Sequence, residues 1–331
     1  MERWTEWNQA LEKSPFQEPR FGESLKRQVR LKAGTKRRTS LPFAGAVAVL
    51  VICLLAAGVF LALPLFKSLN QEELALEDPE WKVRSEYSVQ GETLFTVFPD
   101  PGLSTGKNYG YRIRFTAPFE AFRDKTIAIQ AYHLKSGTRL NVLPARTITE
   151  PTAGHSSLEG FTAEWDLPLS GKWKLEIEVE GAKYGDAVVT VADSPWTLSP
   201  TFDLPYTGND GMAHHYVLAG EEGRLGLLVG PYASQEGIQD RQPFAVGRSN
   251  KALWYFWGTD EELKGECRVV AVRMGDSLLT PQFSVGRLGG GVLGADRTIT
   301  SYLTFPKPGK WRVMVYVGDR LFGSLVVEAT S

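Results

Sequence analysis

The chain has 331 residues, of which 43% are hydrophobic and 23% are charged, and its formal net charge at pH 7 is −1. This composition excludes a chain that is disordered throughout, and the length leaves room for two or three ordinary domains. The two cysteines, Cys53 and Cys267, exclude a disulfide framework, and we expect no intrachain bridge because Cys53 falls in an apolar segment.

Residues 1–40 are predicted to form a cytoplasmic tail with two short amphipathic helices. In the first helix apolar side chains recur at i, i+3 and i+7, and in the second at i, i+4 and i+8, so each helix has one apolar face. Pro15 and Pro19 separate the two helices, because proline interrupts a continuous helix. The predicted partner-binding residues on these faces are Trp4, Trp7, Leu11, Phe21 and Leu25.

Three alternatives remain open for these apolar faces. Tryptophan at helical spacing is typical of helix-in-groove recognition, which favours a soluble cytoplasmic partner for Trp4 and Trp7. The basic second segment favours instead the anionic inner leaflet, near which each Lys or Arg contributes roughly 1 kcal/mol. In the third alternative the tail is disordered and binds nothing.

The stretch from residue 41 to residue 66 contains 26 residues without one charge. At about 1.5 Å of rise per residue, a helix of this length crosses a hydrocarbon core of about 30 Å, so we predict a transmembrane helix. Four basic residues, Lys32, Lys36, Arg37 and Arg38, lie close before this stretch, whereas Lys67 alone follows it before an acidic segment. The positive-inside rule therefore predicts a single-pass cell-membrane protein with a cytoplasmic N-terminus, a linker over 67–80 and an extracytoplasmic body.

After the linker, apolar and polar residues alternate between turn-forming residues, a pattern typical of short antiparallel strands. The segment GKWKLEIEVEG at 171–181 returns at 309–323 as GKWRVMVYVGDRLFG, 138 residues later. Each copy is predicted to form a strand of a closing hairpin, with its tryptophan at the entry of the core. The fold class is therefore predicted to be mainly β, with two tandem immunoglobulin-like β-sandwich modules over 81–193 and 195–331.

Four segments of the second module are distinctive: SPTFDL (199–204), GEEGRLGLLVGP (220–231), LWYFWGTDEELKGECRVVAV (253–272) and GKWRVMVYVGDRLFGSLVVE (309–328). Together they resemble an uncharacterised extracytoplasmic domain family of low-GC Gram-positive bacteria, found in lipoproteins and membrane-anchored proteins. The resemblance covers most of the second module. It implies a β-sandwich outside the membrane and no established activity.

The layout of a short tail, one spanning helix and an outer body, together with the opening segment WTEWNQALEKSPFQEPRFGESLKRQV (4–29), resembles single-pass anti-sigma factors of Gram-positive bacteria. In that family a short cytoplasmic segment holds a transcription factor and an outer domain senses the state of the envelope. The tail contains neither His nor Cys, so the zinc motif of one large anti-sigma class is absent. The resemblance rests on the layout and this opening segment, and it carries over no individual sigma-contacting residue.

No motif in the sequence predicts catalysis. No G-x-S-x-G, HExxH or H-x-x-E-H pattern occurs, and the four histidines have no Cys or acidic ligand at zinc spacing. The glycine-rich segment at 286–294 lacks the Lys and Ser or Thr of a phosphate-binding loop. We therefore predict that the protein is not an enzyme, that it binds no metal or cofactor, and that it has no nucleic-acid partner.

The densest aromatic stretch is LWYFWG at 253–258. In a strand, Trp254 and Phe256 would point to one face and Tyr255 and Trp257 to the other. One pair is expected to fill the core. The other pair, Tyr255 and Trp257, is predicted either to form an exposed platform for a ligand, or to be covered by a loop or by the first module.

These features predict a single-pass membrane regulator of anti-sigma type. Its outer β modules would sense or bind an envelope polymer or protein, and its tail would bind a cytoplasmic sigma factor. The alternative is a membrane-anchored envelope-binding or scaffolding protein that has no signalling role.

Overall fold

The computed structural model describes residues 78–230, 232–234, 237–239 and 244–331. The predicted tail, the predicted transmembrane helix and nearly all of the predicted linker lie outside these residues. Within the described ranges, no helix has both the length and the apolar composition needed to cross a membrane.

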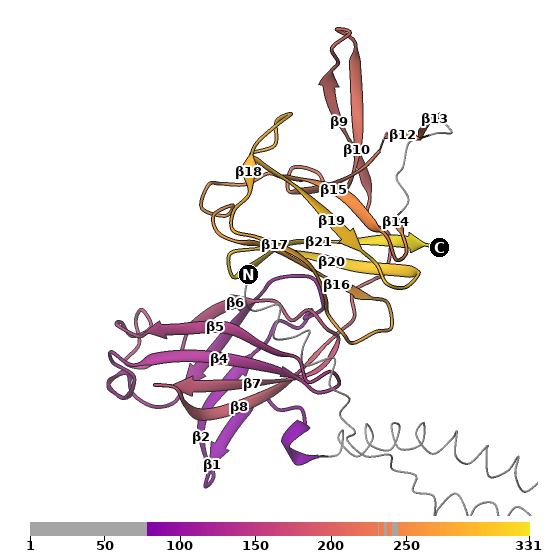
Figure 1. Ribbon diagram of the computed structural model, residues 1–331. Helices are drawn as coiled ribbons and strands as arrows, with labels where there is room; N and C mark the ends of the chain where they lie inside the picture. Colours follow the sequence, from indigo (N-terminus) through magenta and orange to yellow (C-terminus); the bar gives the residue numbers. More distant parts are fainter. Residues whose placement is uncertain (1–77, 231, 235–236, 240–243) are drawn as a thin grey trace, which may run out of the picture. The chain divides into compact units, whose positions relative to one another are not determined.

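Strands β1–β8, which we call the first module, form two four-stranded antiparallel sheets with the orders β1-β2-β3-β6 and β5-β4-β7-β8 (Figure 1). Two short 3-10 helices, η1 (Pro79–Trp81) and η2 (Phe119–Ala121), precede β1 and β4 respectively. The strands are β1 (Glu86–Val89), β2 (Glu92–Phe98), β3 (Tyr109–Phe115), β4 (Thr126–His133), β5 (Arg139–Thr147), β6 (Phe161–Trp165), β7 (Gly171–Val179) and β8 (Ala182–Val191).

Strands β9–β21, the second module, form a six-stranded sheet with the order β18-β19-β15-β11-β10-β9 and a five-stranded sheet with the order β14-β21-β20-β16-β17. Strand β14 runs parallel to β21, and β12 and β13 pair only with each other. The strands are β9 (Thr201–Thr207), β10 (Ala213–Glu221), β11 (Leu225–Gly230), β12 (Tyr232–Ser234), β13 (Gly237–Gln239), β14 (Phe244–Ala245), β15 (Ser249–Phe256), β16 (Cys267–Arg273), β17 (Thr280–Val285), β18 (Gly289–Gly290), β19 (Arg297–Thr304), β20 (Gly309–Val317) and β21 (Arg320–Thr330).

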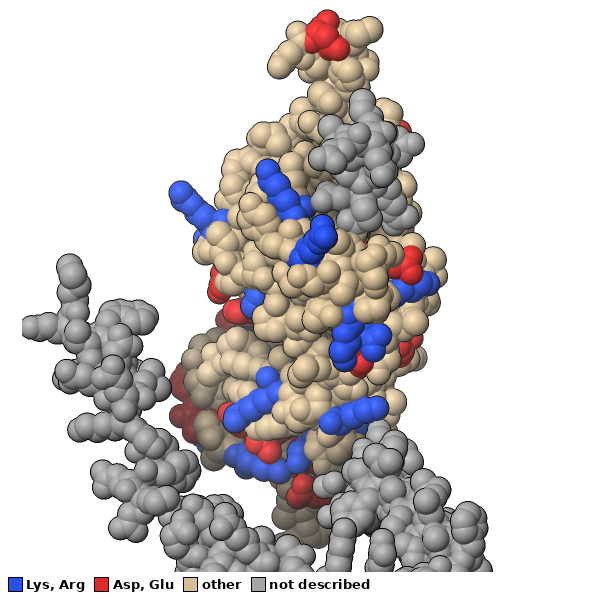
Figure 2. Space-filling view, turned by 45° about the vertical axis from the view of Figure 1, so that its right-hand side comes forward, with Lys and Arg blue, Asp and Glu red and all other residues tan. Residues whose placement is uncertain are grey.

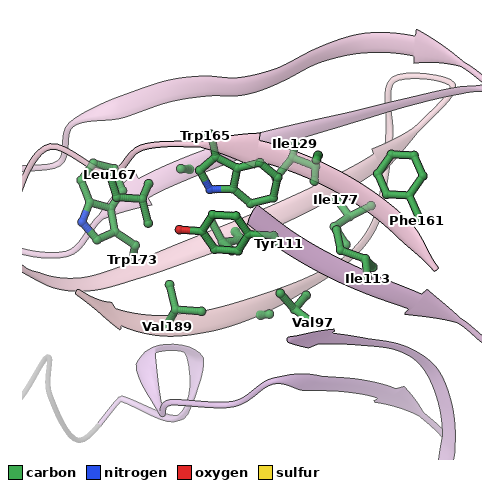
Figure 3. Close-up of a cluster of buried hydrophobic side chains, with 14 of the residues drawn as sticks. Val97, Tyr111, Ile113, Ile129, Phe161, Trp165, Leu167, Trp173, Ile177 and Val189 are labelled. Atoms are coloured by element: carbon green, nitrogen blue, oxygen red, sulfur yellow. The ribbon is translucent and has the colours of Figure 1, made fainter. Parts of the chain in front are cut away.

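Both large sheets of each module contribute side chains to one core. In the first module Tyr111 of β3 stacks on Trp165 of β6 with ring centroids 3.9 Å apart, and Trp173 of β7 belongs to the same cluster (Figure 3). In the second module Trp254 of β15 and Trp311 of β20 belong to the buried cluster. The prediction of a mainly β chain is therefore confirmed for the described residues.

Strands β7 and β20 have the same local structure, as their repeated sequence predicts. Each has nine residues and begins at a glycine in the left-handed region, with φ of +119° at Gly171 and +117° at Gly309. In both strands the indole Nε1 donates to the carbonyl oxygen four residues earlier, at 2.8 Å for Trp173 and 3.0 Å for Trp311. A bulge follows at the same point of each hairpin. The two tryptophans therefore close their cores by the same contact.

The two copies differ on the face that points away from the core of their own module. On β7 this face is charged and only half-buried, and its residues are Lys174, Glu176 and Glu178. On β20 the equivalent face is buried, and its residues are Arg312, Met314 and Tyr316. A strand buried on both faces needs another layer against its second face.

Strands β9 and β10 form a long hairpin at the edge of the six-stranded sheet, which the sequence pattern did not predict (Figure 1). Pro205 and the adjacent pair His214 and His215 interrupt the apolar alternation there. Instead, aromatic rings stack along one face of the hairpin. The ring centroids of Tyr206 and Tyr216 are 4.4 Å apart, and those of Tyr206 and His214 are 5.4 Å apart.

Candidate functional site at the contact between the two modules

The outer face of β16 and β20 packs against the first module, and we call this contact the junction. Both modules belong to one compact unit. Five side chains of the second module lie in the same cluster as the first-module core, and each is 6% exposed or less. They are Val270 and Val272 of β16, Met314 and Tyr316 of β20, and Leu321 of β21. The junction therefore extends the core of the first module onto the second, which accounts for the apolar outer face of β20.

Arg312 fixes the connection between the modules. Its side chain is 3% exposed. Nη1 donates to Thr105 Oγ1 at 2.6 Å and to Asp193 Oδ1 at 3.1 Å, and Nη2 donates to the Ser194 carbonyl oxygen at 2.7 Å. The guanidinium also lies over the Trp196 ring, 4.1 Å from its centroid. The connecting chain is thereby held on β20 by charge-assisted hydrogen bonds and a cation–π contact.

A buried acid and a phenol meet at the junction. The Tyr316 hydroxyl donates to Asp166 Oδ2 at 2.6 Å, and both residues are less than 10% exposed. Burial raises the pKa of Asp166 to about 6, although the hydrogen bond from Tyr316 and the charge of Arg268 oppose the shift. Burial, followed by the Asp166 charge, also raises the pKa of Tyr316. The Arg268 guanidinium lies over the Tyr316 ring, 4.4 Å from its centroid.

Asp166→Asn is expected to remove a pH dependence of stability. Because the folded-state pKa of Asp166 lies above its ordinary value of 3.8, the folded state holds the proton between about pH 4 and pH 6, and its stability falls as pH rises through this window. A shift of about two pKa units corresponds to about 3 kcal/mol. Asparagine retains an acceptor for Tyr316 without the charge.

The measurement is the free energy of unfolding by denaturant at pH 4.5 and pH 7, for the wild-type chain and the Asp166→Asn variant. Between pH 4.5 and pH 7 the free energy of unfolding of the wild type should fall relative to that of Asp166→Asn. Tyr316→Phe serves as the control, because it leaves the carboxylate without its donor and should cost more at pH 7 than at pH 4.5. An equal pH slope in wild type and Asp166→Asn would contradict the assignment.

Close backbone packing completes the junction. Asn108 Nδ2 donates to the Leu321 carbonyl oxygen at 2.6 Å, and Ser324 Oγ donates to the Gly106 carbonyl oxygen at 2.7 Å. Gly106 has φ of +76°, and a Cβ there would lie 2.9 Å from Ser324 Oγ and 3.0 Å from Arg312 Cδ. The left-handed backbone and the lack of space together require glycine at this position.

An open cleft of about 690 Å³ lies beside the junction, and we call it the arginine cleft. Its lining comes from the end of β2, from β3, β5 and β6, and from the start of β21. The charged residues that line it are Asp100, Arg112, Arg146, Glu164 and Arg320. Arg320 pairs with Glu164 at 2.8 Å. The cleft thus combines residues of both modules and has one more basic than acidic side chain.

A second hollow, of about 420 Å³, lies in the second module and is lined by Lys264, Arg287 and the ion pair of Arg297 with Asp260. Neither hollow gathers metal ligands: over the part of the chain that the structure describes, no group of three or more His, Cys, Asp or Glu side chains is placed to hold a metal ion. Cys267 is a buried thiol, and burial raises its pKa to about 12.

The aromatic stretch on β15 alternates as predicted, but it forms no exposed platform. Trp254 and Phe256 lie in the main core of the second module, whereas Tyr255 and Trp257 lie in a smaller cluster on the other face. Tyr255 is 1% exposed, so the prediction of an exposed platform is wrong for this residue. The covering residues are Leu204 and Leu218 of the β9–β10 hairpin and Ala295 of a loop.

Trp257, the other residue of the predicted platform, is half-buried. Its Nε1 donates to the Gly294 carbonyl oxygen at 2.9 Å, and its ring centroid lies 6.2 Å from that of Tyr255. The alternative in which a loop covers this pair therefore describes the structure better. The other predicted binding residues, Trp4, Trp7, Leu11, Phe21 and Leu25, lie outside the described residues.

Sequence reasoning missed the junction, although one signal for it was present. The first copy of the repeat carries Glu176 and Glu178 on its outer face, and the second copy carries Met314 and Tyr316 at the equivalent positions. Replacement of charged by apolar residues on one face of a repeated strand indicates a second buried surface. By contrast, no local pattern marked Asp166 or the arginine cleft.

Comparisons with known proteins place the chain in no family. No family model and no curated protein matches it. Among solved structures, a Bacillus anthracis protein described as a lipoprotein shares 18% identity over 41% of this chain and 87% of its own, with a TM-score of 0.29. The chicken CNTN1 FN1–FN3 domains share 9% identity over 71% of this chain and 64% of their own, with a TM-score of 0.19. Similarity at this level carries no argument about function.

Proposed function

We propose that this chain is a single-pass membrane regulator of anti-sigma type, with an extracytoplasmic body that binds an envelope component. The observation that carries the proposal is the uncharged 26-residue stretch at 41–66, with Lys32, Lys36, Arg37 and Arg38 close before it and Lys67 alone directly after it. A hydrocarbon core accommodates such a stretch, and the flanking charges orient it. On this proposal a ligand outside and a transcription factor inside bind the same chain.

The strand arrangement supports an immunoglobulin-like assignment for both modules. In the first module, β2, β3 and β6 are neighbours in one sheet, and the other sheet has the order β5-β4-β7-β8. In the second module, β11, β15 and β19 take the places of β2, β3 and β6. The order β17-β16-β20-β21 likewise corresponds to β5-β4-β7-β8. A three-strand and a four-strand sheet with this connectivity are typical of immunoglobulin and fibronectin type III sandwiches. Such modules commonly serve as binding domains, but the fold alone does not specify a function.

The junction supports the idea that the two modules act together. Interfaces between domains of one chain are often small and polar, and then permit relative motion. Here the junction contains an apolar cluster, the buried Arg312 and the buried hydrogen bond between Asp166 and Tyr316. A ligand that contacts both modules would therefore meet a preorganised surface, which lowers the entropic cost of binding.

The test for the regulatory part is co-purification with the full-length chain from detergent extracts. We expect a sigma factor to be recovered with the wild type, and recovery to fall by about tenfold or more in the double variant Trp4→Ala and Trp7→Ala, because buried tryptophans are typical interface hot spots. Recovery that does not depend on these tryptophans, or no saturable partner, would reject the regulatory role.

The alternative is an envelope-binding or scaffolding protein whose tail only anchors it. The arginine cleft favours this alternative in one respect, since all of its lining lies in the outer body and its use requires no tail partner. Deletion of residues 1–35 decides between the two. Envelope phenotypes that survive the deletion would support the scaffold, and their loss would support the regulator.

A further inference from the structure

We propose that the arginine cleft binds a phosphodiester-linked polyol or sugar chain. The inference deepens the proposed role of the outer body as a binding unit, and rests on that role, by naming the class of its ligand. It is carried by three features of the cleft: two arginines that have no carboxylate partner among the described residues, one carboxylate with free acceptor capacity, and a glycine in the lining that leaves space open.

Arg112 and Arg146 are the unpaired cations of the cleft. Both are exposed, and no ion pair joins either of them to a carboxylate within the described residues. Arg112 Nε makes only a long hydrogen bond, 3.4 Å, to the Glu159 carbonyl oxygen, and the Arg146 guanidinium lies over the Phe161 ring, 4.9 Å from its centroid. Each retains N–H donors that can hold a phosphate oxygen, for which guanidinium geometry is well suited.

The lining of the cleft has a net positive charge, whereas the body as a whole has a net negative charge. Residues 42–331 carry 27 Lys and Arg against 33 Asp and Glu, whereas the cleft lining has three arginines and two acids. On the face drawn in Figure 2, Lys and Arg side chains are spread among acidic ones and form no continuous basic surface. Binding of an anionic chain would therefore depend on local contacts in the cleft more than on general electrostatic attraction.

The remaining lining fits the uncharged part of such a ligand. Asp100 is exposed and accepts one hydrogen bond, from the Gly102 amide at 2.6 Å, so its carboxylate has capacity for a hydroxyl donor. Thr162, on the neighbouring strand β6, is exposed and also lines the cleft. Phe98 is 44% exposed and offers an apolar surface to the carbon backbone of a polyol or sugar. The lining therefore offers guanidinium donors for phosphate oxygens and a carboxylate acceptor for hydroxyl groups.

Gly110 forms part of the cleft floor. It lies on β3 opposite Glu164 of β6, and a Cβ built on it would meet no other atom within 4 Å. Its φ is not in the left-handed region, so a side chain is tolerated there. Gly110→Leu should therefore fill the cleft from below without disturbing the sheet, which gives a test that is independent of charge.

The experiment measures binding of the purified full-length chain in detergent to poly(glycerol phosphate), with uncharged polyglycerol as the control ligand. We expect saturable binding to the phosphate polymer only, and Arg112→Gln combined with Arg146→Gln should weaken it by about tenfold or more. Lys264→Gln combined with Arg287→Gln removes the same charge from the second hollow and should change affinity by less than about twofold. Gly110→Leu should weaken binding as strongly as the arginine pair.

Vesicles that contain phosphatidylglycerol distinguish the source of the glycerol phosphodiester. Stronger cleft-dependent binding to the polymer than to vesicles would assign the site to a polymer, and the reverse would assign it to lipid headgroups. Absence of wild-type binding to both, or an equal loss in the cleft and second-hollow variants, would overturn the proposal. These outcomes do not depend on a sigma factor, so failure of the ligand site and failure of the regulatory role can be told apart.

Discussion

Replacement of Trp173 or Trp311 by alanine is expected to lower the free energy of unfolding by about 3–5 kcal/mol. The two side chains are 0% and 2% exposed and lie in the main cores of the first and second modules. Removal of an indole from a closed core loses apolar burial and leaves a cavity that the surrounding strands cannot fill. Denaturant titration of the full-length chain, followed by fluorescence and circular dichroism, measures the loss.

The conservative variants Trp173→Phe and Trp311→Phe form the matched control. Phenylalanine retains most of the apolar surface but loses the hydrogen bond from the indole to the carbonyl oxygen four residues earlier. We expect both to cost much less than alanine, and to cost similar amounts, because the two contacts have nearly the same geometry. A large difference between the two phenylalanine variants would contradict the structural equivalence of β7 and β20.

Arg312→Ala is expected to cost about 3 kcal/mol and to loosen the connection between the modules. The substitution removes the guanidinium that donates to Thr105 Oγ1, Asp193 Oδ1 and the Ser194 carbonyl oxygen, and it removes the cation–π contact with Trp196. Truncation of one member of a buried, hydrogen-bonded charge network is generally costly. Denaturation measures the loss of stability, and limited proteolysis of the full-length chain should show faster cleavage near residues 193–200.

Arg320→Ala is the control for this prediction. Arg320 pairs with Glu164, but the two side chains are 71% and 61% exposed, and exposed ion pairs contribute little to stability. This variant should therefore unfold and be cleaved much as the wild type does. If Arg312→Ala behaved like Arg320→Ala, the connection between the modules would not depend on the buried guanidinium.

Local sequence patterns were sufficient to predict much of the β architecture. Period-two alternation predicted β7, where Leu175 and Ile177 are buried and their neighbours are not. The pattern failed at the β9–β10 hairpin, because Pro205 and two histidines replaced the expected apolar residues and ring stacking supplied the packing. The β-propensity of a residue reflects how well it fits a strand that has one face on a core. This edge hairpin is packed by stacked rings instead, so β-propensity did not predict it.

The candidate site was much harder to predict, since its contacts join residues that are far apart in the chain. Asp166 and Tyr316 are 150 positions apart, and Arg312 and Thr105 are 207 positions apart. A single sequence contains no local signal for such pairs. Tyr255 shows the converse problem, because alternation correctly separated the two faces of β15 but gave no information on what covers the second face.

The central claim, that lipid separates a small basic tail from a large β body, is tested most directly by protease treatment of intact protoplasts that produce the full-length chain. Protease added from outside should digest the two modules and leave a small membrane fragment that contains the tail and the segment 41–66. If the modules survived until the membrane was permeabilised, or if the mature chain began after the apolar segment, the protein would not connect the two sides of the membrane.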